Sequence, residues 1–204
     1  MSINGMKLED NFYSAGKVYW DGIEPTLDGM LGGFTMVTSP DINASTRFLT
    51  KWFPQLDAKK SAVKESTAED TESTPSPAET TRALDCGAGI GRVSKHLLLK
   101  FFDTVDLLEQ SDKFLAQTKT YMSAEEYARV GNQYNVGLQD FAPEADVLYD
   151  CIWCQWVVGH LTDEDFVRFL VRCKSALKQP NGVIVVKDNT TSSDECDADT
   201  NDSS

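Results

Sequence analysis

A glycine-rich turn in the middle of the chain has the residue types of a loop that binds a nucleoside. A short apolar run ends in Asp85, and glycines follow at Gly87, Gly89 and Gly91. Because glycine has no Cβ, it lets the backbone turn sharply and approach a ligand closely. A dinucleotide-binding loop would have a glycine where Arg92 stands, and a P-loop would have a Lys-Ser or Lys-Thr pair. The pattern D-x-G-x-G-x-G instead fits a loop that holds S-adenosylmethionine (SAM), with an ordinary strand-to-helix turn as the alternative.

A second candidate contact is the carboxylate of Glu109, which ends the next apolar run, 18 residues after Gly91. An acidic side chain at this place can accept hydrogen bonds from the ribose hydroxyls of a bound nucleoside. Several classes of nucleoside-binding sheet share such an acid, so it does not distinguish between them. A solvated strand end is the alternative.

The elements that would position these residues alternate along the chain. Apolar runs typical of strands cover 82–86, 104–111, 132–141, 149–158 and 183–189, and helical spacing covers 92–102, 112–122 and 162–177. This alternation predicts an α/β fold with a doubly wound, mostly parallel sheet. Ligands of such sheets bind beyond the carboxyl ends of the strands. The last run, 183–189, is apolar enough to predict a strand in the interior of the sheet.

Composition divides the chain into four stretches, which together predict one structural domain. Residues 1–54 are rich in aromatic side chains. Residues 55–81 contain none and are dominated by Ser, Thr, Glu, Lys, Ala and Pro, which predicts a disordered, low-complexity insert. The nucleoside-binding core follows at 82–189, and 190–204 form an acidic tail.

Overall composition limits the classes of partner. The 204 residues are 41% hydrophobic and 25% charged, as in ordinary globular domains. The net charge of −13 disfavours nucleic acid and favours a basic peptide as partner. No apolar run reaches the roughly 18 residues of a membrane-spanning helix, and the N-terminus lacks a secretory-signal pattern. We therefore expect an intracellular protein of the cytoplasm, the nucleus or both, which binds neither nucleic acid nor membrane.

The five cysteines form an odd count without the spacing of a disulfide framework. Cys151 and Cys154 make a C-x-x-C pair, but within an apolar run typical of a buried strand. A redox pair normally opens a helix, and a zinc site needs a second pair of ligands. We therefore predict buried, reduced thiols and no bound metal.

Six longer segments extend these motifs. They are YWDGIEPTLDGMLGG (19–33), LDCGAGIGRVSKHLLL (84–99), GLQDF (137–141), IWCQWVVGHLTD (152–163), RCKSALKQPNG (172–182) and VIVVKDN (183–189). Together they resemble the α-N-terminal protein methyltransferases, over roughly 17–54 and 82–189. The resemblance implies a Rossmann-like class I SAM-dependent methyltransferase fold with a helical extension, 1–54, that closes over the pocket. It also implies methyl transfer from SAM, with S-adenosylhomocysteine (SAH) as product, to the free α-amine of proteins that begin Xaa-Pro-Lys after Met removal.

The resemblance further implies roles for single residues. Cofactor contacts are implied for Gly87, Arg92, Glu109, Gln110, Leu138, Gln139 and Gln155, with Arg92 placed to pair with the methionine carboxylate. Substrate contacts are implied for Trp20, Met30, Leu31, Trp156, Asp199 and Ser204, and catalytic roles for His160, Asn189 and Asp202. By residue type alone, the tryptophans could be core aromatics and the C-terminal acids a solvated tail.

The chain departs from the family at two places. Relatives have a short connection in place of the insert at 55–81. They also continue past the fifth strand into a sixth and a seventh, so the last two strands of the fold are expected to be missing from this chain. The stretch 197–204 nevertheless resembles the family's substrate loop, in which Asp199 would bind the substrate Lys and Asp202 would act near the amine.

Methyl transfer to an amine needs the neutral amine, with a free lone pair. An α-amino group has a pKa of about 8, against roughly 10.4 for a lysine side chain, so a modest base suffices. His160 and Asp202 are suitable types. Two alternatives stay open: a small-molecule methyltransferase on the same fold, and a truncated, weakly active form that binds cofactor or a partner. The sequence leaves open the oligomeric state, the substrate proteins and the degree of methylation.

Overall fold

The computed structural model describes residues 8–54 and 80–190, and a five-stranded parallel sheet forms its centre. The strands are β1 (Arg82–Cys86), β2 (Thr104–Leu108), β3 (Val130–Tyr134), β4 (Cys151–Gln155) and β5 (Val183–Lys187). Their order is β3-β2-β1-β4-β5, so the direction of winding reverses between β1 and β4. The predicted Rossmann-like, doubly wound fold is confirmed.

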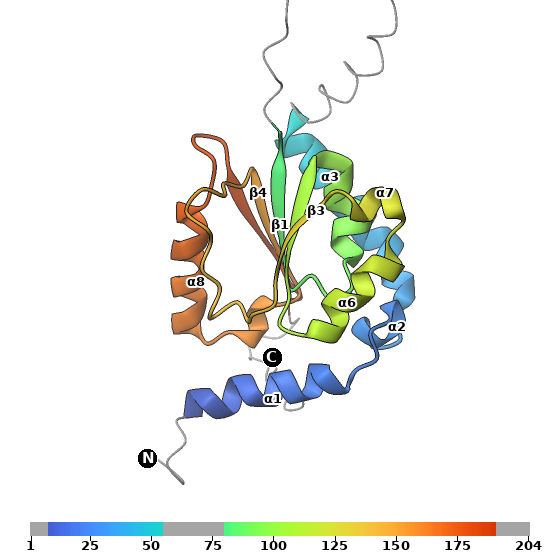
Figure 1. The fold of residues 1–204 in the computed structure, drawn as a ribbon, viewed down its shortest axis with the longest axis vertical. Helices are drawn as coiled ribbons and strands as arrows, with labels where there is room; N and C mark the ends of the chain where they lie inside the picture. The colour runs from blue at the N-terminus through green and yellow to red at the C-terminus, as the bar shows by residue number, and fades with distance from the viewer. Residues whose placement is uncertain (1–7, 55–79, 191–204) are drawn as a thin grey trace, which may run out of the picture.

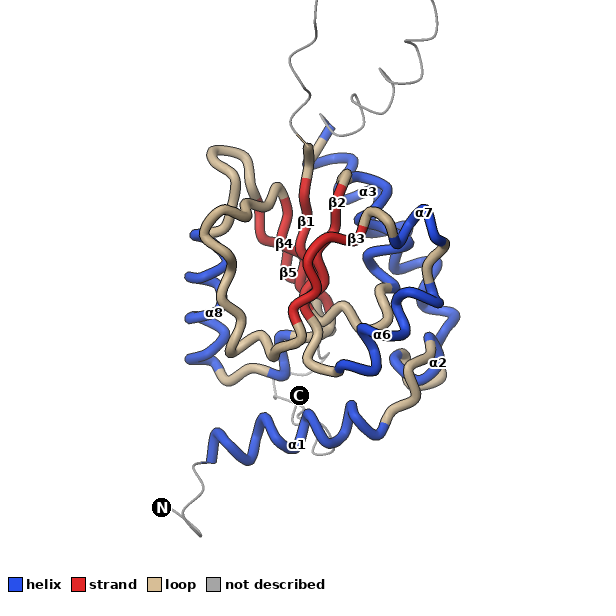
Figure 2. Tube along the Cα trace, in the orientation of Figure 1, coloured by secondary structure: helices blue, strands red, loops and turns tan. Residues whose placement is uncertain are grey.

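Helices cover both faces of this sheet (Figures 1 and 2). On one face lies α8 (Asp163–Ser175), and on the other lie α3 (Thr38–Trp52), α6 (Asp112–Tyr121) and α7 (Ala124–Tyr127). The first helix, α1 (Leu8–Gly22), runs across the carboxyl ends of the strands and is followed by the short α2 (Leu27–Met30). The described part of this N-terminal extension is mostly helical. Most of the predicted insert lies outside the described residues, but Thr81 at its end is buried and bonds to Asp103.

The predicted strands 104–111, 132–141 and 149–158 run past the ends of β2, β3 and β4, which lie at Leu108, Tyr134 and Gln155. The third strand was predicted too long, because the chain turns after Tyr134, where the amide of Asp140 donates to the carbonyl of Gly137 at 3.1 Å. The helix after β1 begins with α-helical Arg92 and Val93, continues as a π-helix (Ser94–Leu98) and ends as α5 (Leu99–Phe101). Among the described strands, β5 lies at the edge of the sheet rather than in its interior, and its Val186 is 45% exposed.

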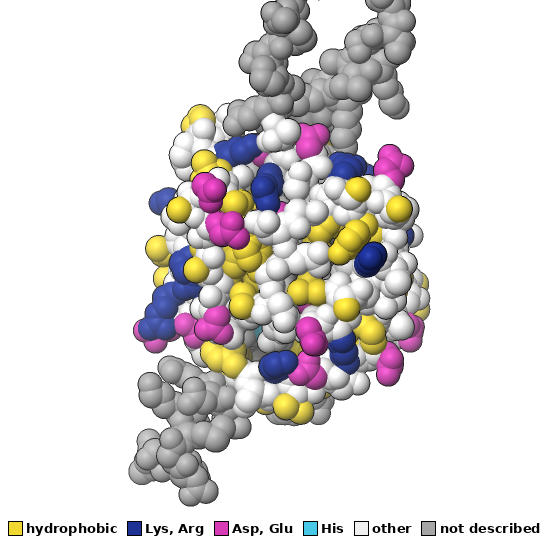
Figure 3. Space-filling model, in the orientation of Figure 1, with side chains coloured by type: hydrophobic (Ala, Val, Ile, Leu, Met, Phe, Trp, Pro, Cys, Tyr) yellow, Lys and Arg dark blue, Asp and Glu magenta, His cyan; other side chains and the backbone are white. Residues whose placement is uncertain are grey.

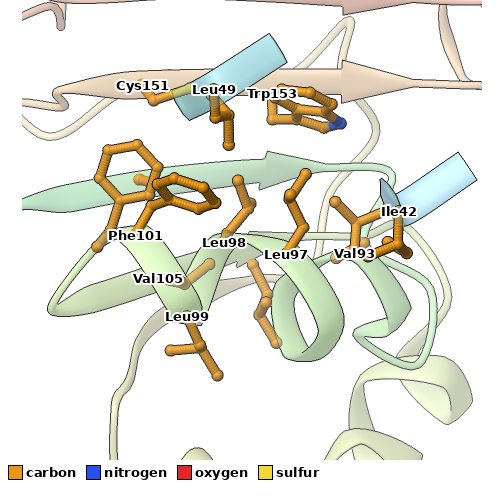
Figure 4. Packing of buried hydrophobic residues seen from close by; sticks show 14 of the residues in the cluster. Ile42, Leu49, Val93, Leu97, Leu98, Leu99, Phe101, Val105, Cys151 and Trp153 are labelled. Atoms are coloured by element: carbon orange, nitrogen blue, oxygen red, sulfur yellow. The ribbon is translucent and has the colours of Figure 1, made fainter. Parts of the chain in front are cut away.

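Two apolar clusters hold the sheet between its helices. On the α3 side, Leu97 and Leu98 are fully buried and pack with Trp153 and Leu49 (Figure 4). On the α8 side, Phe169 is fully buried in a second cluster. Each such side chain contributes about 1.5–3 kcal/mol when it leaves water. This packing fixes the strands whose carboxyl ends carry the predicted site.

The cysteines of the described chain are free and buried. They are Cys86, Cys151, Cys154 and Cys173, whereas Cys196 lies outside the described residues. Burial raises the pKa of the Cys151 and Cys173 thiols, which keeps them protonated and unreactive. The prediction of buried thiols is therefore confirmed for these four.

The molecular surface has no single dominant charge on the face that Figure 3 shows, because acidic and basic side chains are interspersed there. None of the described helices is long and apolar enough to span a membrane.

A buried carboxylate stabilises the sheet near the amino ends of its strands. Asp106 of β2 is completely buried and accepts from the Arg82 guanidinium and the Tyr149 hydroxyl, each at 2.8 Å. The backbone amide of Asn132 also donates to it at 2.8 Å, which ties β3 to β2. All these partners would be left inside the fold without an acceptor if the carboxylate were removed.

We expect Asp106→Asn to lower the free energy of unfolding by about 3 kcal/mol, because it leaves a half-buried guanidinium without its counter-charge. Asp21→Asn is the matched control: its ion pair with Lys17 is exposed, so the loss should stay within about 0.5 kcal/mol. Urea denaturation of the three proteins measures both values. Equal stability of the two variants would contradict the structural role given to Asp106.

Candidate active site

A cavity lies at the carboxyl ends of the strands, with α1 as one of its walls. It is lined by all the predicted cofactor contacts and by most of the predicted substrate and catalytic residues: Gly87, Arg92, Glu109, Gln110, Leu138, Gln139, Gln155, Trp20, Met30, Leu31, Trp156 and His160. A second cavity adjoins it and shares Trp20, Met30, Leu31, Trp156 and His160, and it adds Asn189. Asp199, Asp202 and Ser204 lie outside the described residues.

The glycine loop needs its glycines for two physical reasons. Gly87, Gly89 and Gly91 have φ values of 69°, 56° and 86°, in the left-handed region that side chains with a Cβ avoid. A Cβ at Gly87 would also meet the side chain of Val157 at 2.6 Å. The amide of Gly87 donates to the Leu108 carbonyl at 2.8 Å, so the loop is attached to the end of β2.

Glu109 lies at the end of β2 and is 8% exposed. Its two carboxylate oxygens accept from the amides of Gly89 and Ser111, both at 2.9 Å. Burial raises the pKa of Glu109, and these amides oppose that rise. Because each oxygen has a second lone pair, the carboxylate can still accept from hydroxyls of a ligand in the cavity.

The acid of the glycine motif, Asp85, faces the interior instead of the cavity. Asp85 is 2% exposed and accepts from the Ser94 hydroxyl at 2.6 Å and the Ser94 amide at 3.0 Å. It therefore holds the start of the π-helix against β1. Burial raises its pKa from 3.8 to about 6, although both bonds from Ser94 oppose the rise.

The far end of the cavity is formed by the turn after β3, which contains Leu138 and Gln139. Arg172 of α8 holds this turn: its Nη2 donates to the carbonyls of Leu138 and Gln139 at 3.0 and 2.9 Å, and its Nε donates to that of Phe141 at 2.7 Å. Arg172 was not among the predicted residues, because its side chain contacts backbone atoms that no sequence motif reveals.

The boundary between the two cavities is formed by Trp20, Trp156 and His160. The Trp20 indole N–H donates to His160 Nε2 at 3.3 Å, so this nitrogen is an acceptor and the imidazole proton is assigned to Nδ1. Trp156 has a φ of 55°, unusual for a residue with a side chain, and its amide donates to the Lys187 carbonyl at 3.0 Å.

The position of α1 over the cavities is set by contacts at both of its ends. The Tyr13 hydroxyl donates to Asp165 at the start of α8 at 2.6 Å, and Lys113 of α6 donates to the carbonyl of Asp21. Phe12, Tyr13 and Gly16 line the first cavity as well. The aromatic content of 1–54 hinted at such a wall, but it did not single out these residues.

Arg92 forms an ion pair that the sequence did not reveal. Its Nη1 donates to Asp41 of α3 at 2.8 Å, and its guanidinium lies over the Trp156 ring, 4.9 Å from the ring centroid. Gln155 donates to the same carboxylate at 2.9 Å. The two predicted cofactor contacts thus share a partner from the N-terminal extension.

Comparison with known proteins assigns the family. A profile described as AdoMet dependent proline di-methyltransferase matches residues 8–204. The chain belongs to this family. N-terminal Xaa-Pro-Lys N-methyltransferase 1 of Homo sapiens is 48% identical over 181 residues, which are 89% of this chain and 72% of that protein. N-terminal Xaa-Pro-Lys N-methyltransferase 1-A of Xenopus laevis is 44% identical over 191 residues, which are 94% of this chain and 76% of that protein.

Solved structures agree with this assignment. A SAM-dependent methyltransferase of Leishmania major, 34% identical, matches with a TM-score of 0.75 and covers 98% of this methyltransferase chain and 70% of its own. Phosphoethanolamine N-methyltransferase 1 of Haemonchus contortus matches with a TM-score of 0.55 at 18% identity, which shows a shared fold alone. The enzyme is therefore a SAM-dependent methyltransferase, and the predicted cofactor is confirmed.

The methyltransferase should lose stability as Asp85 ionises. Its pKa is raised from 3.8 to about 6, so stability relative to Asp85→Asn should fall as the pH rises from about 4 to about 7. The shift of roughly two pH units corresponds to about 3 kcal/mol. Unfolding free energies of both proteins across this range measure the difference. The exposed Asp146→Asn serves as control and should show no such trend, and a constant difference for Asp85→Asn would contradict the buried, near-neutral carboxyl.

Proposed function

We propose that this methyltransferase acts on the free α-amino group of proteins that begin Xaa-Pro-Lys after Met removal, with SAH as second product. The observation that carries the proposal is that the two cavities adjoin, because Trp156 and His160 line both of them. A methyl donor in one cavity and an amine in the other would meet at these side chains. The relatives from Homo sapiens and Xenopus laevis are named for this activity.

The first cavity suits SAM in charge and in shape. Arg92 supplies a cation for a carboxylate, Glu109 supplies acceptors for ribose hydroxyls, and the glycine loop lets a ligand approach the backbone at Gly87. When bound, SAM supplies a methyl group on a sulfonium, which is electrophilic. The contribution of the protein is to bind this group, to orient it and to keep water away from it.

His160 is placed to manage the proton of the substrate amine. Its Nε2 carries the one free lone pair of the neutral ring, which accepts from the Trp20 indole in this structure, so His160 would take a proton from the amine when the amine replaces this indole N–H. The Trp20 ring meets the imidazole edge to face, with ring centroids 5.9 Å apart. We assign to Trp20 the role of holding the His160 ring at the border of the two cavities until the amine binds.

The second cavity suits the first residues of a peptide. Trp20, Met30, Leu31 and Trp156 offer apolar surface for a side chain and for proline. Asn189 lines the same cavity and can bond to a peptide backbone. Asp199 and Asp202 stay proposed partners of the substrate lysine and amine. Asp188, which the sequence motifs did not single out, also lines this cavity and adds a carboxylate that attracts a cation.

The purified chain should methylate a synthetic Xaa-Pro-Lys peptide in the presence of SAM, with the added mass on the α-amine. Tandem mass spectrometry locates the methyl groups. The N-acetylated peptide is the control for the α-amine, and a peptide with Glu in place of Lys is the control for the basic residue. Both should remain unmodified. Methylation of the lysine side chain, or of neither site, would refute the proposal.

Trp20→Phe should reduce kcat/KM for the same peptide by roughly three- to tenfold, because it keeps an aromatic ring but removes the N–H that holds His160. Tyr19→Phe is the matched control, because it removes a hydroxyl from the neighbouring residue of α1 and leaves its ring. Steady-state kinetics give kcat/KM for both variants and for the wild type. An equal kcat/KM in wild type and Trp20→Phe would show that the indole N–H has no such role.

A further inference from the structure

Asp41 is a buried carboxylate in the N-terminal extension that has no role in the motifs described above. It lies in the first turn of α3 and is 8% exposed. Its oxygens accept from Arg92 Nη1 at 2.8 Å, from Gln155 Nε2 at 2.9 Å, and from Lys187 Nζ. Lys187 also donates to the Ser45 hydroxyl, one turn further along α3, at 2.8 Å.

The three partners of Asp41 come from three separate parts of the core. Arg92 follows the glycine loop, Gln155 ends β4, and Lys187 ends β5. Arg92 and Gln155 line the first cavity, and Lys187 precedes the residues that line the second. A single carboxylate therefore connects α3 to both cavities.

Asp41 is ionised in this environment. Burial opposes its charge, but the hydrogen bonds from Lys187, Arg92 and Gln155 outweigh that effect and lower its pKa. The ions of the cluster are then one carboxylate and two cations, Arg92 and Lys187, which leaves one net positive charge. An excess positive charge beside the cavity favours an anionic group of a ligand.

The Arg92 guanidinium is only partly used by Asp41. Among the described residues, its hydrogen bonds come from Nη1 alone, whereas a guanidinium has five N–H donors in a rigid, planar arrangement. Trp156 covers one face of the plane. With one nitrogen bound to Asp41 and one face against a ring, the remaining donors have a fixed direction. Gln155 is fixed in the same way, because its Oε1 accepts from Trp153 Nε1 at 3.0 Å while its amide donates to Asp41.

We propose that Asp41 is a positioning residue for cofactor binding, which orients Arg92 and Gln155 toward the amino-carboxylate arm of SAM. The inference rests on the SAM-binding part of the proposed function and extends it to a residue of the N-terminal extension. Asp41 acts through Arg92 and Gln155 and does not itself touch the cofactor. Asp41 could instead weaken SAM binding by competing with the carboxylate of SAM for Arg92. Lys187 reduces this competition, because its positive charge offsets the negative charge of Asp41.

The experiment compares two ligands that differ in this arm. SAH carries it, whereas 5′-methylthioadenosine has the same adenosine and thioether without it. Calorimetry gives the dissociation constant of each ligand for wild type and for Asp41→Asn, with displacement titration for the weaker ligand. We expect Asp41→Asn to weaken SAH at least about tenfold and to change 5′-methylthioadenosine by less than about twofold.

Two further variants separate positioning from general destabilisation. Asp106→Asn is the matched control, because it also breaks a buried Asp–Arg ion pair but lies away from the lining of both cavities. It should lower the thermal midpoint and leave the ratio of the two dissociation constants unchanged. Lys187→Met removes the second cation of the cluster at a side chain that is partly exposed. It should weaken SAH relative to 5′-methylthioadenosine, and it replaces Asp41→Asn if that variant does not fold.

The possible results distinguish a positioning role of Asp41 from a purely structural role and from competition with the ligand. Equal weakening of both ligands by Asp41→Asn would mean a structural role only, and tighter binding of SAH would mean competition; either result overturns the proposal. Unchanged affinity for both ligands overturns it as well. If wild type binds neither ligand, the SAM-binding part of the proposed function fails, which is a different result from wild-type binding that Asp41→Asn leaves unaltered.

Discussion

A carboxylate that folding removes from water must be met by cations or hydrogen-bond donors, because an isolated buried charge is strongly destabilising. Asp41 imposes this requirement where the helical extension meets the sheet. Its partners follow the glycine loop and end β4 and β5, so the requirement fixes the relative positions of four elements at once. The carboxyl ends of the strands, and with them both cavities, are arranged around this one charge.

Buried carboxylates near the first cavity differ in the partners that they have. Cations hold Asp41 ionised, whereas Glu109 has backbone amides and Asp85 has a single serine. Burial favours the neutral form of all three, but the partners of Asp41 outweigh this effect and lower its pKa, whereas the pKa values of Glu109 and Asp85 are raised. The first cavity thus has the ion pair of Arg92 at one side and, at Glu109, a carboxyl group whose pKa burial raises. This division suits a ligand with a charged arm and an uncharged nucleoside.

Features that are set by residues close together in the sequence could be predicted. The glycine loop and the apolar strands are local patterns, and Thr162 caps α8 as its position indicated. Asp41 could not be predicted, because its partners lie 51 to 146 residues away in the sequence. The composition of β5 did not indicate its edge position, since an edge strand and an interior strand can have the same composition, whereas the expectation that the last two strands of the fold are missing did imply it. Roles for single residues came from the family resemblance, and the fold then brought most of these residues together.

Trp156 has a left-handed backbone conformation that costs a non-glycine residue roughly 1–2 kcal/mol. A search for heat-resistant variants would be drawn to this position, because glycine would adopt the same backbone without that cost. Trp156→Gly would, however, also remove the ring that lies against Arg92. Laboratory evolution of this enzyme for thermal resistance therefore has to screen for turnover as well, because a screen for stability alone would not detect the loss of the indole.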